Sequence, residues 1–156
     1  MKAFNQPWNA DPGTVFGQLA MLDGLFGRES TTYSTSDGGT TVSGANIVKG
    51  IWIRTAASGA VTETTDTAAN IVAACSGALQ GGNIPRGGNV PIGWATVVRV
   101  VNQGSGQTIT WTAGSGVTVI GTATIANNAW RDFLMTVNGV GANAAVTFLN
   151  IGGGTV

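Results

Sequence analysis

Residues 94–126 decide the fold class, and they read WATVVRVVNQGSGQTITWTAGSGVTVIGTATIA. The segment from Gln107 to Thr112 alternates strictly, so Ile109 and Trp111 are expected on one face of a strand and threonines on the other. The segment from Trp94 to Asn102 is apolar on both faces, which is typical of a central strand. The sequence therefore predicts closely spaced strands separated by turns.

The same pattern continues outward from this stretch. Short β-branched runs bounded by glycine or asparagine predict an antiparallel β-sandwich or barrel, since no βαβα rhythm indicates a parallel sheet. A faint echo between residues 55–62 and 112–118 is too short for a solenoid, and we interpret it as shared turn chemistry. The further expected strands are residues 47–54, 117–120, 122–126, 130–137 and 145–150.

One short α-helix is expected at about residues 67–80. Ile71, Cys75 and Leu79 recur every four residues, and Asp66 is suited to cap the helix N-terminus. The single cysteine lies in the middle of this apolar stripe. We therefore expect Cys75 to be a core residue rather than a reactive thiol.

The chain divides by composition into two parts, an N-terminal arm with a Ser/Thr/Gly linker at residues 1–45 and a β-rich domain at residues 46–156. An apolar stripe with helical spacing runs through the arm, although Gly17 and Gly24 weaken a helix there. This apolar stripe consists of Val15, Leu19, Leu22 and Phe26.

The arm has more large apolar side chains than a segment of its size can bury by itself. We therefore expect it to pack on the β-rich domain, on a sister subunit or on a larger assembly. Its expected partner-binding residues are Phe4, Trp8, Phe16, Leu22 and Phe26.

The charge content is unusually low. Only 9% of the residues are charged, against about 25% in a typical soluble chain, and the seven acidic and seven basic residues cancel. A surface of this kind is either neutral and polar or buried against partners, so we expect a homo-oligomer. The basic residues are never neighbours, which argues against nucleic acid as a partner.

No segment of the sequence predicts membrane insertion or export. The longest apolar candidate, residues 15–26, is short and interrupted by Asp23 and by glycines. No apolar core follows the positively charged start at Lys2. We expect the protein to be made in a cytoplasm and to remain there until it assembles.

The residues that most often carry catalysis are missing. The chain has no histidine and one cysteine, which removes the commonest general base, the usual triads and a structural zinc site. Of its seven carboxylates, only Asp132 falls in an expected strand. We therefore expect no enzyme activity and no catalytic, cofactor-binding or metal-binding residues.

The tetrapeptide Trp130-Arg131-Asp132-Phe133 is the most distinctive short motif. In a strand, Arg131 and Asp132 point to opposite faces. They are candidates for contact with a neighbouring subunit. Alternatively, they are solvated charges at a sheet edge, where charges block unwanted strand pairing.

Three stretches carry a resemblance to a known family: NIVKGIWIRT at residues 46–55, TTDTAANIVAA at residues 64–74 and TIANNAWRDFL at residues 124–134. Residues 46–150 resemble capsid decoration (cement) proteins of tailed bacteriophages. The resemblance implies a virion structural protein on the capsid exterior, made in the host cytoplasm. It also implies a trimer that ties major capsid proteins together and stabilises the head lattice.

Two other functions fit the same composition. One is a structural module of a tail, fibre or baseplate, which would be equally rich in threonine and glycine. The other is a carbohydrate-binding β-sandwich for host attachment, which would carry solvent-exposed tryptophan or tyrosine.

Overall fold

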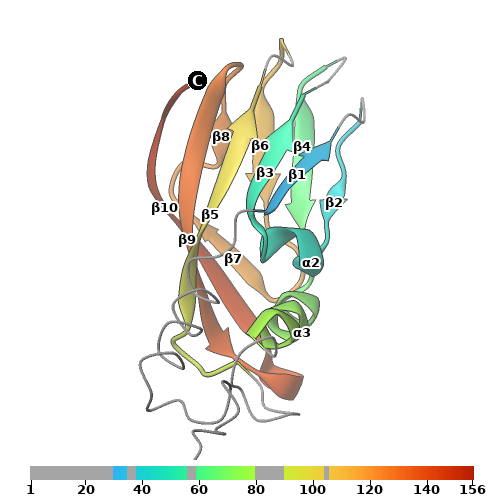
Figure 1. Cartoon of the computed structure of the whole chain (residues 1–156), viewed down its shortest axis with the longest axis vertical. Helices are drawn as coiled ribbons and strands as arrows, with labels where there is room; N and C mark the ends of the chain where they lie inside the picture. Colours follow the sequence, from blue (N-terminus) through green and yellow to red (C-terminus); the bar gives the residue numbers. More distant parts are fainter. Residues whose placement is uncertain (1–29, 35–37, 56–58, 80–89, 104–105) are drawn as a thin grey trace, which may run out of the picture.

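In the computed structural model, the described residues are 30–34, 38–55, 59–79, 90–103 and 106–156. Over these residues the fold is mainly β, with two short helices (Figure 1). The strands are β1 Ser30–Ser34, β2 Thr41–Val42, β3 Gly50–Arg54, β4 Val61–Thr65, β5 Ala95–Asn102, β6 Ile109–Thr112, β7 Val117–Ile120, β8 Thr124–Ile125, β9 Ala129–Gly139 and β10 Ala145–Thr155. The helices are α2 Gly44–Ile47 and α3 Ala68–Leu79, with a 3₁₀ turn η1 at Gly141–Asn143.

The strands form two sheets rather than a closed barrel. The larger sheet has the order β1-β3-β5-β9-β10-β7, and the smaller has the order β2-β4-β6-β8. Both are mixed, because β1-β3, β3-β5, β10-β7, β2-β4 and β4-β6 are parallel pairs. The predictions of purely antiparallel pairing and of a barrel are therefore wrong.

The parallel pairs arise because the chain alternates between the sheets. From β1 to β9, odd-numbered strands lie in the larger sheet and even-numbered strands in the smaller one. Parallel neighbours need a crossover connection, which is usually a helix. Here a strand of the other sheet forms part of each crossover, so no helical rhythm marks the parallel pairs in the sequence.

Helix α3 confirms the helix expected at residues 67–80, with one correction at its start. The hydroxyl of Thr67, not the carboxylate of Asp66, accepts the hydrogen bond from the N–H of Asn70. Cys75 is fully buried within the core, as predicted. Helix α2 occupies residues 44–47, so the strand expected from Ile47 begins only at Gly50.

The two helices lie next to one another below the ends of β3 and β4 (Figure 1). Their backbones approach closely at Gly44, where a Cβ atom would lie 2.7 Å from the carbonyl oxygen of Asn70. Glycine is therefore required at this contact, and α2 is seated directly on α3.

Both sheets and α3 contribute to one hydrophobic core. At its centre, Trp111 of β6 lies 6.3 Å from Phe133 of β9 and 6.1 Å from Phe148 of β10, measured between ring centroids. Such spacing is favourable for aromatic pairs. The predicted inward positions Ile109 and Trp111 are confirmed as buried.

The ordered strands begin earlier than the expected domain boundary at residue 46. Strand β1 pairs with β3 in the larger sheet, and β2 pairs with β4 in the smaller one. Residues 30–34 and 41–42 therefore lie in strands of the two sheets. Residues 1–29, which hold the arm, lie outside the described residues.

Candidate functional site

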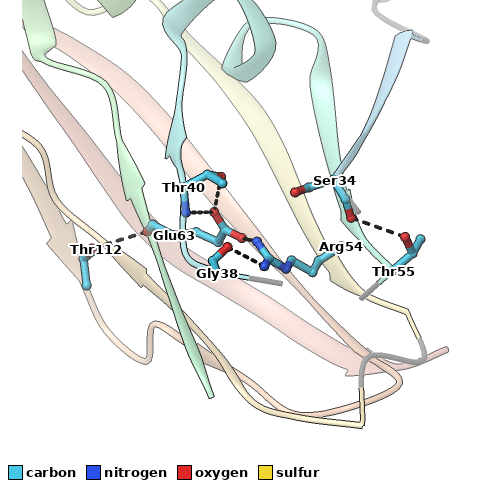
Figure 2. A network of polar contacts seen from close by, with 7 residues as sticks. All are labelled: Ser34, Gly38, Thr40, Arg54, Thr55, Glu63 and Thr112. Atoms are coloured by element: carbon cyan, nitrogen blue, oxygen red, sulfur yellow. Dashed lines mark hydrogen bonds and ion pairs between the residues drawn. The ribbon is translucent and has the colours of Figure 1, made fainter. Parts of the chain in front are cut away.

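A buried ion pair connects the two sheets (Figure 2). Arg54 is the last residue of β3, and its Nη1 donates to Oε1 of Glu63 in β4. Both side chains are fully buried. The second guanidinium nitrogen donates to the carbonyl oxygen of Gly38 at 2.6 Å. The pair thus ties a strand of each sheet to the connection between β1 and β2.

The other oxygen of Glu63 is also satisfied. Oε2 accepts from the backbone N–H of Thr40 at 3.1 Å and from its hydroxyl at 2.7 Å. A carboxylate with both oxygens engaged and no solvent exposure cannot reach a substrate. The chain passes close here, since a Cβ atom on Gly39 would lie 2.1 Å from the carbonyl oxygen of Thr62. We therefore interpret Arg54 and Glu63 as structural residues.

The surroundings of this pair reveal a repeat that the sequence did not. Ile51 pairs with Arg99 in the larger sheet and Thr64 pairs with Thr112 in the smaller one, and the partners in both pairs are 48 residues apart. Each of the segments 51–64 and 99–112 runs from the larger sheet to the smaller one. We call residues 51–64 the first arch and residues 99–112 the second arch.

The arches place different chemistry at equivalent positions. Asn102 stands where the first arch has Arg54, and Trp111 stands where it has Glu63. All four side chains are buried. Asn102 donates through Nδ2 to the carbonyl oxygens of Gln107 at 2.6 Å and Ile125 at 3.2 Å. This repeat differs from the echo seen in the sequence, and only two of its fourteen residues, both threonine, are identical between the arches.

Asp66 joins the helices rather than forming a site. Its carboxylate accepts from the backbone N–H groups of Gly44 at 2.9 Å and Thr67 at 2.8 Å, and from Nδ2 of Asn70 at 2.7 Å. Burial by itself would raise the pKa of Asp66, but these hydrogen bonds outweigh it and hold the pKa below its ordinary value. The carboxylate is therefore held in its ionised form by the folded structure.

Asp132 pairs with Arg99, not with its neighbour Arg131. Arg99 donates to both carboxylate oxygens at 2.8 Å, and its guanidinium lies 4.3 Å from the ring centroid of Trp130. The hydrogen bond to Asp132 raises the pKa of Arg99 above its ordinary value. Arg131 donates instead to the carbonyl oxygen of Thr124 at 2.7 Å. The side chains of the two predicted contact residues, Arg131 and Asp132, thus bond to different parts of the structure.

Strand β9 lies inside the larger sheet, between β5 and β10. The interpretation of Arg131 and Asp132 as charges guarding a sheet edge is therefore wrong. Their proposed contact with another subunit stays a prediction. The expected partner-binding residues Phe4, Trp8, Phe16, Leu22 and Phe26 all lie outside the described residues.

The face of the larger sheet that points away from the core carries a continuous apolar row. Val97 of β5 pairs with Leu134 of β9, Leu134 pairs with Leu149 of β10, and Leu149 pairs with Ile120 of β7. Val97, Leu149 and Ile120 are 45%, 41% and 47% exposed. We call these four residues the outer row. The strand order of the larger sheet aligns them, although they are far apart in the sequence.

Among residues 30–34, 38–55, 59–79, 90–103 and 106–156, no cluster of three or more cysteine or carboxylate side chains could hold a metal ion. No helix in this part of the chain has the length and apolarity needed to span a membrane.

Comparisons with known proteins found no family model, no curated protein and no solved structure that matches this chain.

Proposed function

We propose that this chain is a structural subunit of a tailed-bacteriophage virion, which binds the capsid lattice as a homo-oligomer and reinforces it. The observation that carries the proposal is the outer row. On the same face, the charges of Arg99 and Asp132 compensate one another. A contiguous apolar surface of this kind is typical of a face that other protein chains cover. The resemblance of residues 46–150 to decoration proteins supports the capsid as the place of assembly.

The described charged residues support assembly over catalysis. Arg54 and Glu63 bond to each other between the two sheets, and Asp66 bonds to both helices. These charged groups are therefore already engaged in structural contacts. We also infer that the two sheets pack as a β-sandwich, the arrangement that a shared core favours.

The carbohydrate-binding alternative expects an open aromatic platform. Trp130 is half-buried, and Arg99 occupies a position over its ring. This arrangement favours a surface made for protein contacts over one made for stacking on a sugar.

Addition to purified heads tests the proposal. Capsids lacking this chain are incubated with the purified protein, and occupancy is measured by electron microscopy on complete particles and on tailless heads. We expect saturable binding to both. Binding restricted to tails would support the tail or fibre alternative, and binding to isolated glycans without capsids would support the carbohydrate-binding alternative.

A matched pair of variants locates the surface. Leu149→Lys places a charge in the outer row, whereas Ile92→Lys changes an apolar residue that is 66% exposed outside the strands. We expect Leu149→Lys to weaken capsid binding at least about tenfold, because other chains of the proposed assembly cover the outer row and one buried apolar side chain corresponds to at least that factor in affinity. Equal occupancy of the two variants would remove the outer row from the proposal.

A further inference from the structure

The N-terminal segment matches the outer row in size and in number of side chains. The apolar stripe at residues 15–26 has four members with helical spacing, and a helix over these residues would extend about 17 Å. The outer row also has four members, one on each of four adjacent strands. With neighbouring strands about 4.8 Å apart, the row extends over about 14 Å. A helix lying across the strands could therefore cover the whole row.

Strand β1, which follows the segment in the chain, begins at the height of the outer row. Ser30, the first residue of β1, pairs with Gly50, and the next residue of β3, Ile51, pairs with Arg99. Strand β1 therefore begins at the level of Val98, next to Val97 of the outer row. Ser30, the first described residue after the N-terminal segment, thus lies at the edge of the larger sheet and at the level of the row.

Residues 15–26 can only just reach the outer row of their own chain. Val97 lies two strands from β1, about 10 Å along the sheet, and a helix packs about 10 Å above it. The path from Ser30 to Phe26 must therefore span about 14 Å, which four residues reach only when fully extended. If the row begins one strand from β1, the path from Ser30 to Phe26 spans only about 11 Å, and these four residues need not be fully extended.

A second copy can offer its row at that shorter distance. In the larger sheet, β7 is the edge opposite β1, and the pairings make the two edge strands point in the same direction. Neither edge strand, STTYS at 30–34 or VTVI at 117–120, contains the charge or proline that commonly blocks pairing between edges. With β7 of a neighbour beside β1, its Ile120 is the nearest member of the row.

We propose that residues 15–26 of one chain lie across the outer row of a second copy and so hold the homo-oligomer together. This inference rests on the oligomer of the proposed function and names the contact that forms it. Phe26 then covers Ile120 of the neighbour, and Leu22 covers Leu149. Because the contact joins different surfaces of the two copies, repeating it gives a closed ring, such as a trimer, when three successive rotations return to the first copy.

Disulfide trapping tests which chain supplies the segment. One chain carries Leu22→Cys, and a second chain, enlarged by a tag, carries Leu149→Cys. The two are co-expressed, purified as an oligomer and mildly oxidised. Cys75 is fully buried and serves as an unreactive background. We expect a crosslink between the tagged and untagged chains, and none when Ile92→Cys replaces Leu149→Cys in the tagged chain.

Each outcome decides the inference. A crosslink that forms only within single chains carrying both Leu22→Cys and Leu149→Cys would place the segment on its own sheet and overturn the proposal. Equal crosslinking to Leu149→Cys and Ile92→Cys, or none to either, would also overturn it. Capsid occupancy is measured separately: crosslinking without capsid binding would contradict the proposed function alone, and capsid binding without crosslinking would contradict this inference alone.

The mass of the oligomer in solution gives a second measurement. Leu22→Asp changes the apolar stripe, whereas Ala20→Asp changes a residue outside the stripe that a helical segment would carry on another side. Sedimentation should show the dissociation constant raised at least about tenfold by Leu22→Asp relative to Ala20→Asp. Equal dissociation constants for the two variants would exclude a helix seated through the stripe.

Discussion

The two arches keep one register in both sheets, but their buried positions are filled differently. The first arch has an ion pair between Arg54 and Glu63, and the second has Asn102 and Trp111 at the same places. The first therefore depends on compensation between two buried charges, while the second depends on an amide and a large apolar ring. The backbone arrangement therefore does not require an ion pair, since the second arch has none at these positions. In the first arch, however, each buried charge requires the other.

The largest effect should come from removing one charge of the first arch. Glu63→Ala leaves the guanidinium of Arg54 buried without its carboxylate, and we expect it to lower the free energy of unfolding by about 3–5 kcal/mol. Urea denaturation followed by tryptophan fluorescence measures this value.

A double variant sharpens the same test. Arg54→Met/Glu63→Leu removes both charges and retains much of the apolar volume, so its stability should lie within about 1 kcal/mol of the parent or exceed it. If the double variant is as unstable as Glu63→Ala, the hydrogen bonds to Gly38 and Thr40, rather than charge compensation, hold the first arch.

A smaller effect is expected at the equivalent polar position of the second arch. Asn102→Ala removes the donor from two carbonyl oxygens, those of Gln107 and Ile125. Because the groups left behind are neutral, we expect a loss of about 1–3 kcal/mol, below that of Glu63→Ala. The same denaturation experiment checks the order, and a reversed order would contradict the comparison between the arches.

The residue after β4 offers a test by pH. Asp66 follows the first arch and precedes α3, and the equivalent residue 48 positions further on is Gly114. The second arch therefore has no carboxylate at this position. The pKa of Asp66 is lowered in the fold, so its ionised form stabilises the folded state at neutral pH. This contribution is lost as the pH falls below about 4 through the folded pKa.

We expect Asp66→Ala to cost about 1 kcal/mol at pH 7. The difference from the parent should shrink as the pH falls below about 4, because the parent's carboxylate is then protonated. Thermal unfolding at several pH values measures both. A difference that does not change between pH 7 and the acid range would show that the carboxylate's charge has no part in joining α2 to α3.

The smallest effect should come from the exposed pair. Arg99→Ile places in the second arch the residue that the first arch has at Ile51. The side chain of Arg99 is 45% exposed and its pair with Asp132 is screened by solvent, so the free energy of unfolding should change by no more than about 1 kcal/mol. A loss as large as that of Glu63→Ala would mean that position in the arch, rather than burial, sets the value of an ion pair.

Local pattern in the sequence determined the mainly β class and many of the elements. Alternation in residues 107–112 identified the inward positions Ile109 and Trp111, and the four-residue spacing around Cys75 identified α3, because both patterns depend only on neighbouring residues. Composition alone gives the low charge content, and residue spacing alone gives the apolar stripe of the arm.

Only the tertiary structure decided which strands are neighbours. Strand order joins residues far apart in the chain, and no local pattern records that a connection crosses to a second sheet. For this reason the parallel pairs, the partners of Glu63 and Asp132, and the alignment of the outer row could not be predicted. The arches share few side chains, since a sheet repeats through backbone hydrogen bonds that many different sequences can make.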